Sequence, residues 1–296
     1  MDQPPIPAIW TIRTLLGWST PWLARRGIDS ARLDGELLLA KALGARRIDL
    51  FLDPDRPLNP EELADFKALI VRRAAREPVA HIVGMREFWG MTFLSSGAAL
   101  IPRPETELLV ETILSHFPDR SAPLAFLEPC VGSGALLCAL LKEYPQAIGV
   151  GSDLSAEALG LARRNVEKCG YAARVELYQG DMDEGISERL FDGVVVNPPY
   201  IVSGELAGLQ PEVRDWEPRL ALDGGEDGLT LLKRLPALFW RRVREGGVGV
   251  TEIGYDQGEQ VVALFREAGF AKVELLMDYH RLPRAVVMKV EGREEV

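Results

Sequence analysis

The spacing of apolar residues changes character along the chain. Up to about residue 78, apolar side chains recur every three or four positions, as they do on one face of a helix. From Pro123 onward, short apolar runs alternate with helical segments. The first pattern predicts a small helical domain, and the second predicts a sheet built from βαβ units.

One helix is predicted after residue 30. Ser30 is a candidate N-cap for a helix that begins at Ala31, because its hydroxyl can accept a hydrogen bond from a free backbone N–H of the first turn. The apolar spacing places Leu33, Leu37 and Ala40 on one face. We therefore expect these three side chains to pack into a core.

A second helix has a stronger start signal. Asn59 as N-cap, Pro60 at the first helical position and Glu62 two residues later form the pattern of a capping box. The predicted buried stripe of this helix is Leu63, Phe66 and Ile70. Residues 1–78 are thus expected to form an N-terminal helical domain, and residues 79–102, with the stretch REFWGMTFLSSG, a hairpin or linker.

Residues 103–296 are expected to form an α/β domain. Seven strands are predicted in LAFLE, IGVGS, RVELY, FDGVVVN, VGVTEI, KVELLM and RAVVMKV. Only DYHRLP separates the last two, which is too short for a crossover helix, so these two should pair antiparallel. The prediction is a seven-stranded, doubly wound sheet with its last strand antiparallel.

Composition narrows the class of protein. Hydrophobic residues make up 47% of the chain and charged residues 26%, and no stretch approaches the roughly 18 apolar residues of a membrane helix. The start MDQPPIPAIW lacks the basic and apolar regions of a secretory signal. We expect a cytoplasmic protein that does not bind membranes.

The net charge and the spacing of potential metal ligands argue against a nucleic-acid-binding protein and against a metal site. The net charge is −10, and the excess of acids lies after residue 90, which argues against stable nucleic-acid binding. The three cysteines and three histidines lack the spacing of a metal site. We expect no metal and reduced thiols, with a small ligand or a protein as partner.

A glycine turn follows the first predicted strand of the sheet. Gly132 and Gly134 allow positive φ angles and a close approach of a ligand to the backbone. Asp153 ends the second strand 19 residues after Gly134, where an acid can accept hydrogen bonds from ribose hydroxyls. Asp181, after the third strand, could accept from an adenine amino group while Met182 packs on the ring. The simpler interpretation is a tight turn, with Asp153 as an acid at the start of a helix capped by Ser155, and with Asp181 in a solvated turn.

The charge of these side chains favours one cofactor over another. With Glu128 on the first strand, the carboxylates gather where a pyrophosphate would otherwise lie. That disfavours NAD and suits a cationic cofactor. We expect S-adenosylmethionine to bind here, with S-adenosylhomocysteine as its product.

The fourth strand ends in Asn197, Pro198, Pro199 and Tyr200. An asparagine offers both an acceptor and a donor, and the proline rings fix the direction of the neighbouring carbonyls. Two acceptors on one side could hold both hydrogens of a planar –NH₂ group while Tyr200 stacks on it. The alternative is a proline turn without chemistry, which explains the prolines better than the polar Asn197.

At this point the chain resembles a known family. NPPYI, with ARLDGELLLAKALG, REFWGMTFL, LIPRPETELLVE, LQPEVRDWEPRLALDGGEDGL and EIGYDQ, is similar to the HemK/PrmC release-factor glutamine methyltransferases from about residue 12 to residue 290. The resemblance implies a class I, S-adenosylmethionine-dependent methyltransferase sheet. It also implies methyl transfer to the side-chain amide nitrogen of the glutamine in a Gly-Gly-Gln motif, with class 1 peptide chain release factors as partners that dock on the helical domain.

The resemblance also implies site residues. Asn197 and the Pro198 carbonyl would hold the substrate amide, with Tyr200 stacked on it. The expected catalytic and substrate-binding residues are Asn197, Pro198, Pro199, Tyr200, Arg103 and Glu105. The expected cofactor-binding residues are Glu128, Cys130, Val131, Gly132, Ser133, Gly134, Asp153, Asp181, Met182 and Asn197.

One departure from the family keeps alternatives open. Cys130 stands where the family usually has the first glycine of the turn, and its side chain would crowd the cofactor unless the backbone shifts. EPCVGSG also resembles the turn of adenine-N6 nucleic-acid methyltransferases, which share Asn-Pro-Pro-Tyr. A glutamine methyltransferase of a ribosomal protein and a cofactor-binding module without activity are further alternatives.

Overall fold

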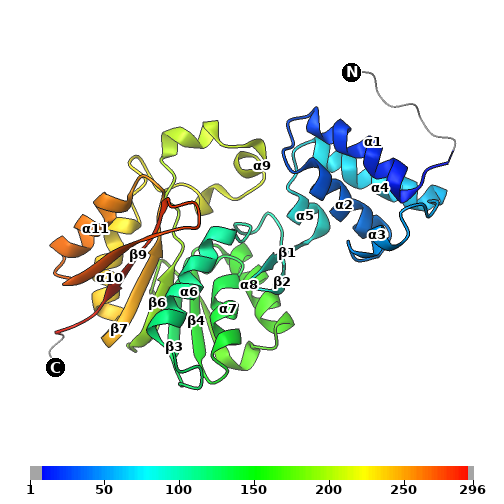
Figure 1. Ribbon diagram of the computed structural model, residues 1–296. Helices are drawn as coiled ribbons and strands as arrows, with labels where there is room; N and C mark the ends of the chain where they lie inside the picture. The colour runs from blue at the N-terminus through cyan, green and yellow to red at the C-terminus, as the bar shows by residue number, and fades with distance from the viewer. Residues whose placement is uncertain (1–8, 293–296) are drawn as a thin grey trace. The chain divides into compact units, whose positions relative to one another are not determined.

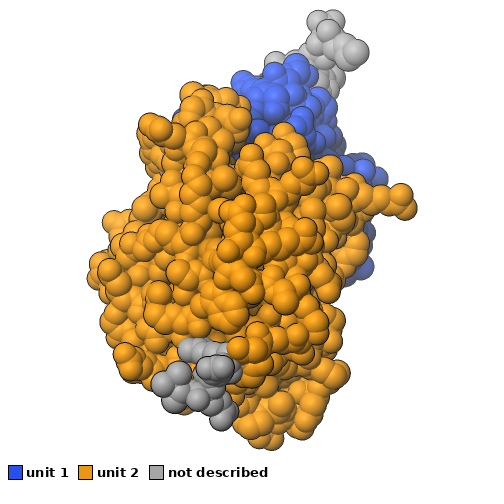
Figure 2. Space-filling view, turned by 90° about the vertical axis from the view of Figure 1, so that its left-hand side faces the viewer, with its two compact units in different colours: residues 1–84, 210–216 blue, residues 85–209, 217–296 orange. Residues whose placement is uncertain are grey.

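The computed structural model describes residues 9–292, and these form two compact units. The first unit comprises residues 1–84 and 210–216, and the second comprises residues 85–209 and 217–296 (Figure 2). Residues 1–8, on which the expected absence of a secretory signal rests in part, lie outside the described residues. Within residues 9–292, no helix is long and apolar enough to cross a membrane.

Short helices make up the first unit (Figure 1). They are α1 (Ile12–Ala24), α2 (Ala31–Ala42), α3 (Asp49–Leu52), α4 (Pro60–Ala74), α5 (Val79–Val83) and, from the later segment, α9 (Pro211–Arg214). Their core includes Leu23, Leu38, Leu39 and Phe66. The start of α4 is as predicted, because the Asn59 side chain accepts from Glu62 N at 2.9 Å and the Glu62 carboxylate accepts from Asn59 N at 3.0 Å.

The predicted buried face of α2 is partly wrong. The helix begins at Ala31 as expected, but the Ser30 side chain makes no capping hydrogen bond. Leu33 is 43% exposed, whereas Asp34 is only 2% exposed. The reason is a buried ion pair: Arg73 Nε of α4 donates to Asp34 Oδ2 at 2.6 Å. This carboxylate takes the place in the core that periodicity assigned to an apolar side chain.

The same arginine ties residues 210–216 to the helices of this unit. Arg73 Nη2 lies 2.7 Å from Glu212 Oε1, and Arg76 Nη2 lies 2.5 Å from Glu212 Oε2. Arg73 is 4% exposed, so its partners replace the hydration that burial removes.

Replacing Arg73 should destabilise the first unit strongly. Arg73→Ala would leave Asp34 as an uncompensated buried charge, so we expect the free energy of unfolding to fall by about 3 kcal/mol. Urea denaturation followed by circular dichroism measures this. The matched control is Arg13→Ala, which breaks the exposed pair with Asp55 and should leave the midpoint nearly unchanged. Equal midpoints for the two variants would contradict the expected contribution of the buried ion pair to the free energy of unfolding.

The second unit opens with a hairpin and continues into a seven-stranded sheet. Strands β1 (Met85–Phe88) and β2 (Met91–Leu94) pair antiparallel. The sheet order is β5-β4-β3-β6-β7-β9-β8. Its strands are β3 (Ala125–Pro129), β4 (Ile148–Asp153), β5 (Val175–Gln179), β6 (Phe191–Val196), β7 (Val243–Glu252), β8 (Lys272–Met277) and β9 (Pro283–Lys289). Of these seven strands, β9 alone runs opposite in direction to the other six, which confirms the predicted fold class.

Helices cover both faces of this sheet (Figure 1). One core includes α6 (Glu107–His116) and α7 (Ala135–Glu143), against Phe126, Val195 and Val250. The core on the other face includes α10 (Leu235–Arg242) and α11 (Gly258–Glu267), against Val194, Val196 and Val286. Helix α8 (Ala156–Lys168) joins β4 to β5, and short 3-10 turns occur at Pro104–Thr106, Ala172–Arg174, Ser203–Gly208, Arg219–Ala221 and Leu232–Arg234.

The parallel strands bring their last residues to one edge. Strands β3, β4, β5, β6 and β7 all run in the same direction. Each is therefore followed by a loop at the edge where open α/β sheets bind ligands.

Candidate active site

A cavity of about 280 Å³ lies at this edge within the second unit. The predicted site residues that line it are Arg103, Glu128, Cys130, Val131, Gly132, Ser133, Asp153, Asp181, Met182, Asn197 and Pro199. The structure thus places predicted cofactor-binding residues and predicted substrate-binding residues around the same cavity. The predicted residues that do not line it are Glu105, Gly134, Pro198 and Tyr200.

The glycine turn after β3 forms one wall of the cavity. Gly132 has φ +52°, and an added Cβ there would meet nothing closer than Ala99 Cβ at 3.9 Å, so the backbone lies open to the cavity. Gly134 has φ +76° and packs against Ala162, 3.4 Å from the place of a Cβ. Glycine therefore serves two purposes here, since one position exposes the backbone and the other allows α7 to approach α8 closely.

Two carboxylates fix the shape of this turn. Gly132 N donates to Asp153 Oδ2 at 2.9 Å, while Ser155 N donates to Asp153 Oδ1 at 2.9 Å. Leu137 N donates to Glu128 Oε2 at 2.8 Å. Burial raises the pKa of both carboxyl groups, and for Glu128 the Asp153 charge acts in the same direction. A carboxylate oxygen can accept more than one hydrogen bond, so Asp153 can still accept from a ligand.

Cys130 adopts a left-handed backbone conformation in place of the expected glycine. Its φ is +58°, which is uncommon for a residue with a Cβ, and its side chain lines the cavity. Burial, with the Asp153 charge, raises the pKa of the Cys130 thiol to about 12. The group is therefore an uncharged thiol at neutral pH and adds no negative charge to the turn.

The three cysteines should differ in reactivity. The hydrogen bond from the Cys138 thiol lowers the pKa of Cys169 to about 7. Cys169 and Cys130 are both partly exposed, whereas Cys138 is buried. Because the thiolate is the nucleophile, iodoacetamide at about pH 8 should label Cys169 first. Peptide mass spectrometry over a time course measures this, with urea-unfolded protein as the control that labels all three alike. Equally fast labelling of Cys130 would contradict the prediction.

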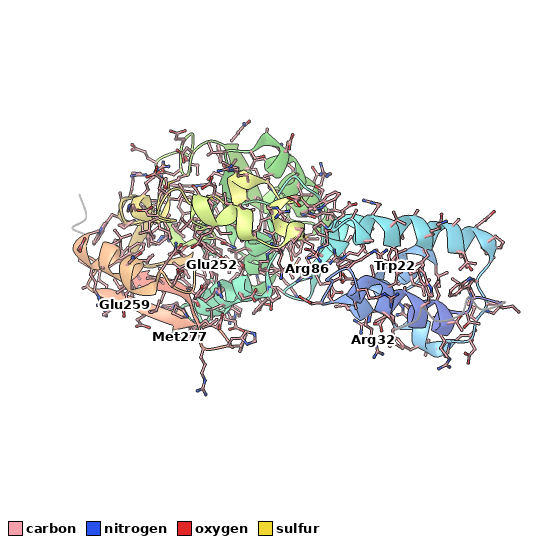
Figure 3. The ribbon with its side chains drawn as sticks, turned by 90° about the horizontal axis from the view of Figure 1, so that it is seen from above. Trp22, Arg32, Arg86, Glu252, Glu259 and Met277 are labelled. Carbon is pink, nitrogen blue, oxygen red and sulfur yellow. The ribbon has the colours of Figure 1, made fainter. Side chains whose placement is uncertain are left out.

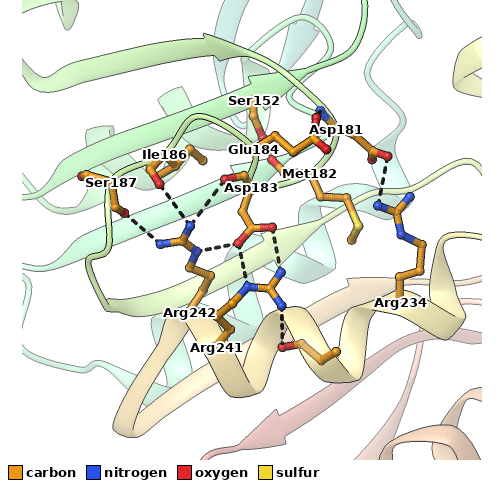
Figure 4. Close-up of polar contacts among 11 residues, drawn as sticks. Ser152, Asp181, Met182, Asp183, Glu184, Ile186, Ser187, Arg234, Arg241 and Arg242 are labelled. Atoms are coloured by element: carbon orange, nitrogen blue, oxygen red, sulfur yellow. Dashed lines mark hydrogen bonds and ion pairs between the residues drawn. The ribbon is translucent and has the colours of Figure 1, made fainter.

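The loop after β5 contributes Gly180, Asp181 and Met182 to the cavity lining, and Figure 4 shows the polar contacts that hold this loop. Asp181 Oδ2 accepts from Arg234 Nη2 at 3.0 Å, and both residues line the cavity. Asp183 accepts from Arg241 Nη2 at 2.8 Å and from Arg242 Nε at 2.6 Å, which fastens the loop to α10. Met182 is 6% exposed, and its carbonyl accepts from the Ser152 hydroxyl. Arg234 was not predicted, because its partner lies 53 residues away in the chain.

Asn197 directly follows β6 and lines the cavity. Its Nδ2 donates to Thr106 Oγ1 at 3.1 Å. Because one N–H of the amide donates to Thr106, the amide group is held in one orientation, and its carbonyl Oδ1 can accept from a ligand. Three residues on, the Tyr200 hydroxyl donates to Glu252 Oε1 at 3.0 Å, and neither residue lines the cavity.

Sequence reasoning missed further residues around this site. Glu217 accepts from Ile101 N at 3.0 Å and from the Arg103 guanidinium, so it holds the predicted substrate-binding Arg103 in place. Thr106 lies in the short turn before α6, where no sequence signal marked it. Glu252 ends β7, and the rule that placed Asp153 and Asn197 at strand ends would have found it too.

The charge of the cavity lining suits a cationic ligand. Glu128, Asp153 and Asp181 line it, while its two cations, Arg103 and Arg234, are paired with Glu217 and Asp181. Among residues 9–292, no group of three His, Cys, Asp or Glu side chains could hold a metal ion.

Fold and cavity together define a methyltransferase. The family model of the methyltransferase small domain matches residues 104–209, and that of the PrmC N-terminal domain matches residues 14–84. The release factor glutamine methyltransferase of Geobacter sulfurreducens is 43% identical over 280 residues, which cover 95% of this chain and 97% of that protein. The enzyme of the same name from Caulobacter vibrioides is 43% identical over 88% of this chain and 90% of its own length. The chain belongs to the release factor glutamine methyltransferase family.

Solved structures resemble the chain in fold alone. A methyltransferase from Pyrococcus furiosus matches with a TM-score of 0.51 and 15% identity, covering 76% of this chain and 98% of that one. The hMettl16 catalytic domain, solved with an RNA hairpin, matches with a TM-score of 0.58 and 13% identity, covering 75% of this chain and 81% of that one. These likenesses support the methyltransferase sheet and say nothing of substrate.

Proposed function

We propose that this protein transfers a methyl group from S-adenosylmethionine to the side-chain amide nitrogen of the glutamine in the Gly-Gly-Gln motif of class 1 release factors. The observation that carries the proposal is the position of Asn197. It lines the same cavity as the glycine turn, and its nitrogen is held by Thr106. An acceptor at this place suits a planar –NH₂ group, and family membership favours glutamine over adenine.

The cofactor is proposed to lie along the turn from Glu128 to Gly134. Asp153 would accept from its ribose hydroxyls and Asp181 from its adenine amino group, with Met182 beside the ring. Bound there, S-adenosylmethionine would supply a methyl group on a positively charged sulfur. The carboxylates that line the cavity support this placement, because they favour a cation.

The protein's own contribution is positioning. An amide nitrogen is a poor nucleophile because its lone pair is delocalised into the carbonyl. Asn197 Oδ1 and the Pro198 carbonyl would accept the two N–H hydrogens and aim the nitrogen along the axis of methyl transfer. A nitrogen–carbon bond forms as the carbon–sulfur bond breaks, and the excess proton then leaves the nitrogen for water.

The helical N-terminal domain, predicted as residues 1–78, is proposed to dock the release factor. Exposed apolar side chains gather on the first unit in and beside α3, at Ile48, Phe51 and Leu52. Such a group is typical of a protein-binding surface. We place the reaction in the cytoplasm, because three free cysteines suit a reducing compartment.

Mass spectrometry of the Gly-Gly-Gln peptide tests the proposal. A release factor incubated with enzyme and S-adenosylmethionine should gain one methyl group on that glutamine, and a release factor with alanine at that position should gain none. Parallel reactions with duplex DNA and with ribosomal proteins should remain unmethylated. Methylation of DNA adenine instead, or of a ribosomal protein alone, would overturn it.

A further inference from the structure

A buried carboxylate, Glu252, has no role in the reaction described above. It contacts the Asn-Pro-Pro-Tyr turn through the hydroxyl of Tyr200. Glu252, which is labelled in Figure 3, is the last residue of β7. Its exposed fraction is 1%. Thr106 Oγ1 donates to its Oε2 at 2.6 Å, and the Tyr200 hydroxyl donates to its Oε1 at 3.0 Å. Each carboxylate oxygen therefore accepts one hydrogen bond, one from Thr106 and the other from Tyr200 of the Asn-Pro-Pro-Tyr turn.

The direction of these hydrogen bonds matters. A threonine hydroxyl has a single proton, and Thr106 gives it to Glu252. Towards Asn197, Thr106 can then only accept, which requires the asparagine to present its –NH₂ group. The 3.1 Å contact from Asn197 Nδ2 to Thr106 Oγ1 has this direction. An acceptor at position 252 thereby determines that Asn197 turns its –NH₂ group to Thr106, which leaves Oδ1 as the acceptor for the substrate.

We propose that Glu252 is a positioning residue for methyl transfer, which orients the Asn197 carbonyl through Thr106 and holds Tyr200 through its second oxygen. The proposal rests on the proposed function, since it explains how Asn197 is set to accept from a substrate amide. Glu252 does not line the cavity, so it acts only through these two neighbours.

The surroundings of Glu252 support a role beyond packing. Burial raises the pKa of its carboxyl group, the hydrogen bonds from Thr106 and Tyr200 oppose that change, and the Arg284 charge opposes it too, while Glu105 adds to it. An apolar side chain of similar size would avoid the cost of burying this charge. That the site holds an acceptor of two convergent hydrogen bonds indicates that their direction is needed.

The central test is Glu252→Gln, which keeps the shape of the side chain but replaces one acceptor by an –NH₂ donor. With Thr106 no longer obliged to donate, Asn197 can flip its amide. We expect kcat on a release factor to fall by about 10- to 100-fold, with KM for the release factor and Kd for S-adenosylmethionine within about threefold of wild type. Steady-state kinetics and calorimetry measure the two effects separately.

Thr106 offers a paired test of the same relay. Thr106→Val removes the hydroxyl at nearly constant volume and should lower kcat to a similar extent, while Thr106→Ser restores the hydroxyl and should recover most of it. Asp192→Asn is the matched control, because Asp192 is a buried carboxylate on β6 at the opposite edge of the sheet, where it accepts from Ala125 N at 2.7 Å. The kcat of Asp192→Asn should stay within about twofold of the wild-type value.

Three outcomes would overturn the proposal: Glu252→Gln with unchanged kcat, Glu252→Gln that loses kcat and cofactor affinity together, or Thr106→Ser without recovery. Thermal unfolding by circular dichroism identifies a variant that is simply misfolded. Failure of the proposed function itself is distinct, because the wild-type enzyme would then leave the release factor unmethylated.

Discussion

Asn197→Ala should lower kcat for methylation of a release factor by about 100- to 1000-fold, the range found when one preorganised hydrogen-bonding group is removed from an active site. The affinity for S-adenosylmethionine should change little, because the proposed cofactor contacts lie mainly on the turn after β3 and on Asp153. Single-turnover kinetics at saturating cofactor measures the first effect, and calorimetry measures the second.

Two further variants sharpen this result. Asn197→Asp keeps the size and the acceptor but removes the –NH₂ group that donates to Thr106, so it should lose most turnover as well. Asn59→Ala is the control at an asparagine that caps α4 in the first unit, and it should keep kcat at saturating substrate. A variant Asn197→Ala that retains half of wild-type activity would refute the assigned role.

The fold was largely predictable because strands and turns leave local signals. Apolar runs marked all seven strands of the sheet, and the short DYHRLP connection predicted the antiparallel β8–β9 pair. The exception in α2 shows the limit of periodicity. Asp34 is buried because Arg73 pairs with it, and nothing near Asp34 in the sequence announces a partner on another helix.

The site was predictable where it follows strand ends. Asp153 ends β4 and Asn197 directly follows β6, and these two strands run in the same direction, so sheet topology alone brings both residues to one edge. Thr106 and Glu217 belong to segments that reach the site by tertiary packing, and their partners lie 91 and 114 residues away. Spacing carries no information over such separations.

Substrate choice depends on more than the Asn-Pro-Pro-Tyr turn. The contacts of Asn197 suit any planar –NH₂ group, whether amide or adenine, because each presents two hydrogens in a plane. The distinction has to come from what surrounds the turn. Family membership over nearly the whole chain, together with the helical first unit, favours a protein substrate.

Asp153→Ala should weaken binding of S-adenosylmethionine by about 100-fold, which corresponds to roughly 2.7 kcal/mol. Two losses add up in this variant. The proposed acceptors for the ribose hydroxyls disappear, and Gly132 N and Ser155 N lose the carboxylate that holds the turn in shape. Isothermal titration with S-adenosylmethionine measures the change, and Asp119→Ala, which alters an exposed loop before β3, should bind normally.

The pH dependence of binding gives this prediction a second observable. Burial raises the pKa of Asp153, so its carboxyl group is protonated at a higher pH than an ordinary aspartate. Affinity that depends on the carboxylate should therefore be present at neutral pH and fall as the pH drops through this raised value. Asp153→Asn, which has no charge to lose, should bind weakly with a flatter pH profile. Wild-type affinity in Asp153→Ala, or an unchanged profile in Asp153→Asn, would remove Asp153 from the cofactor site.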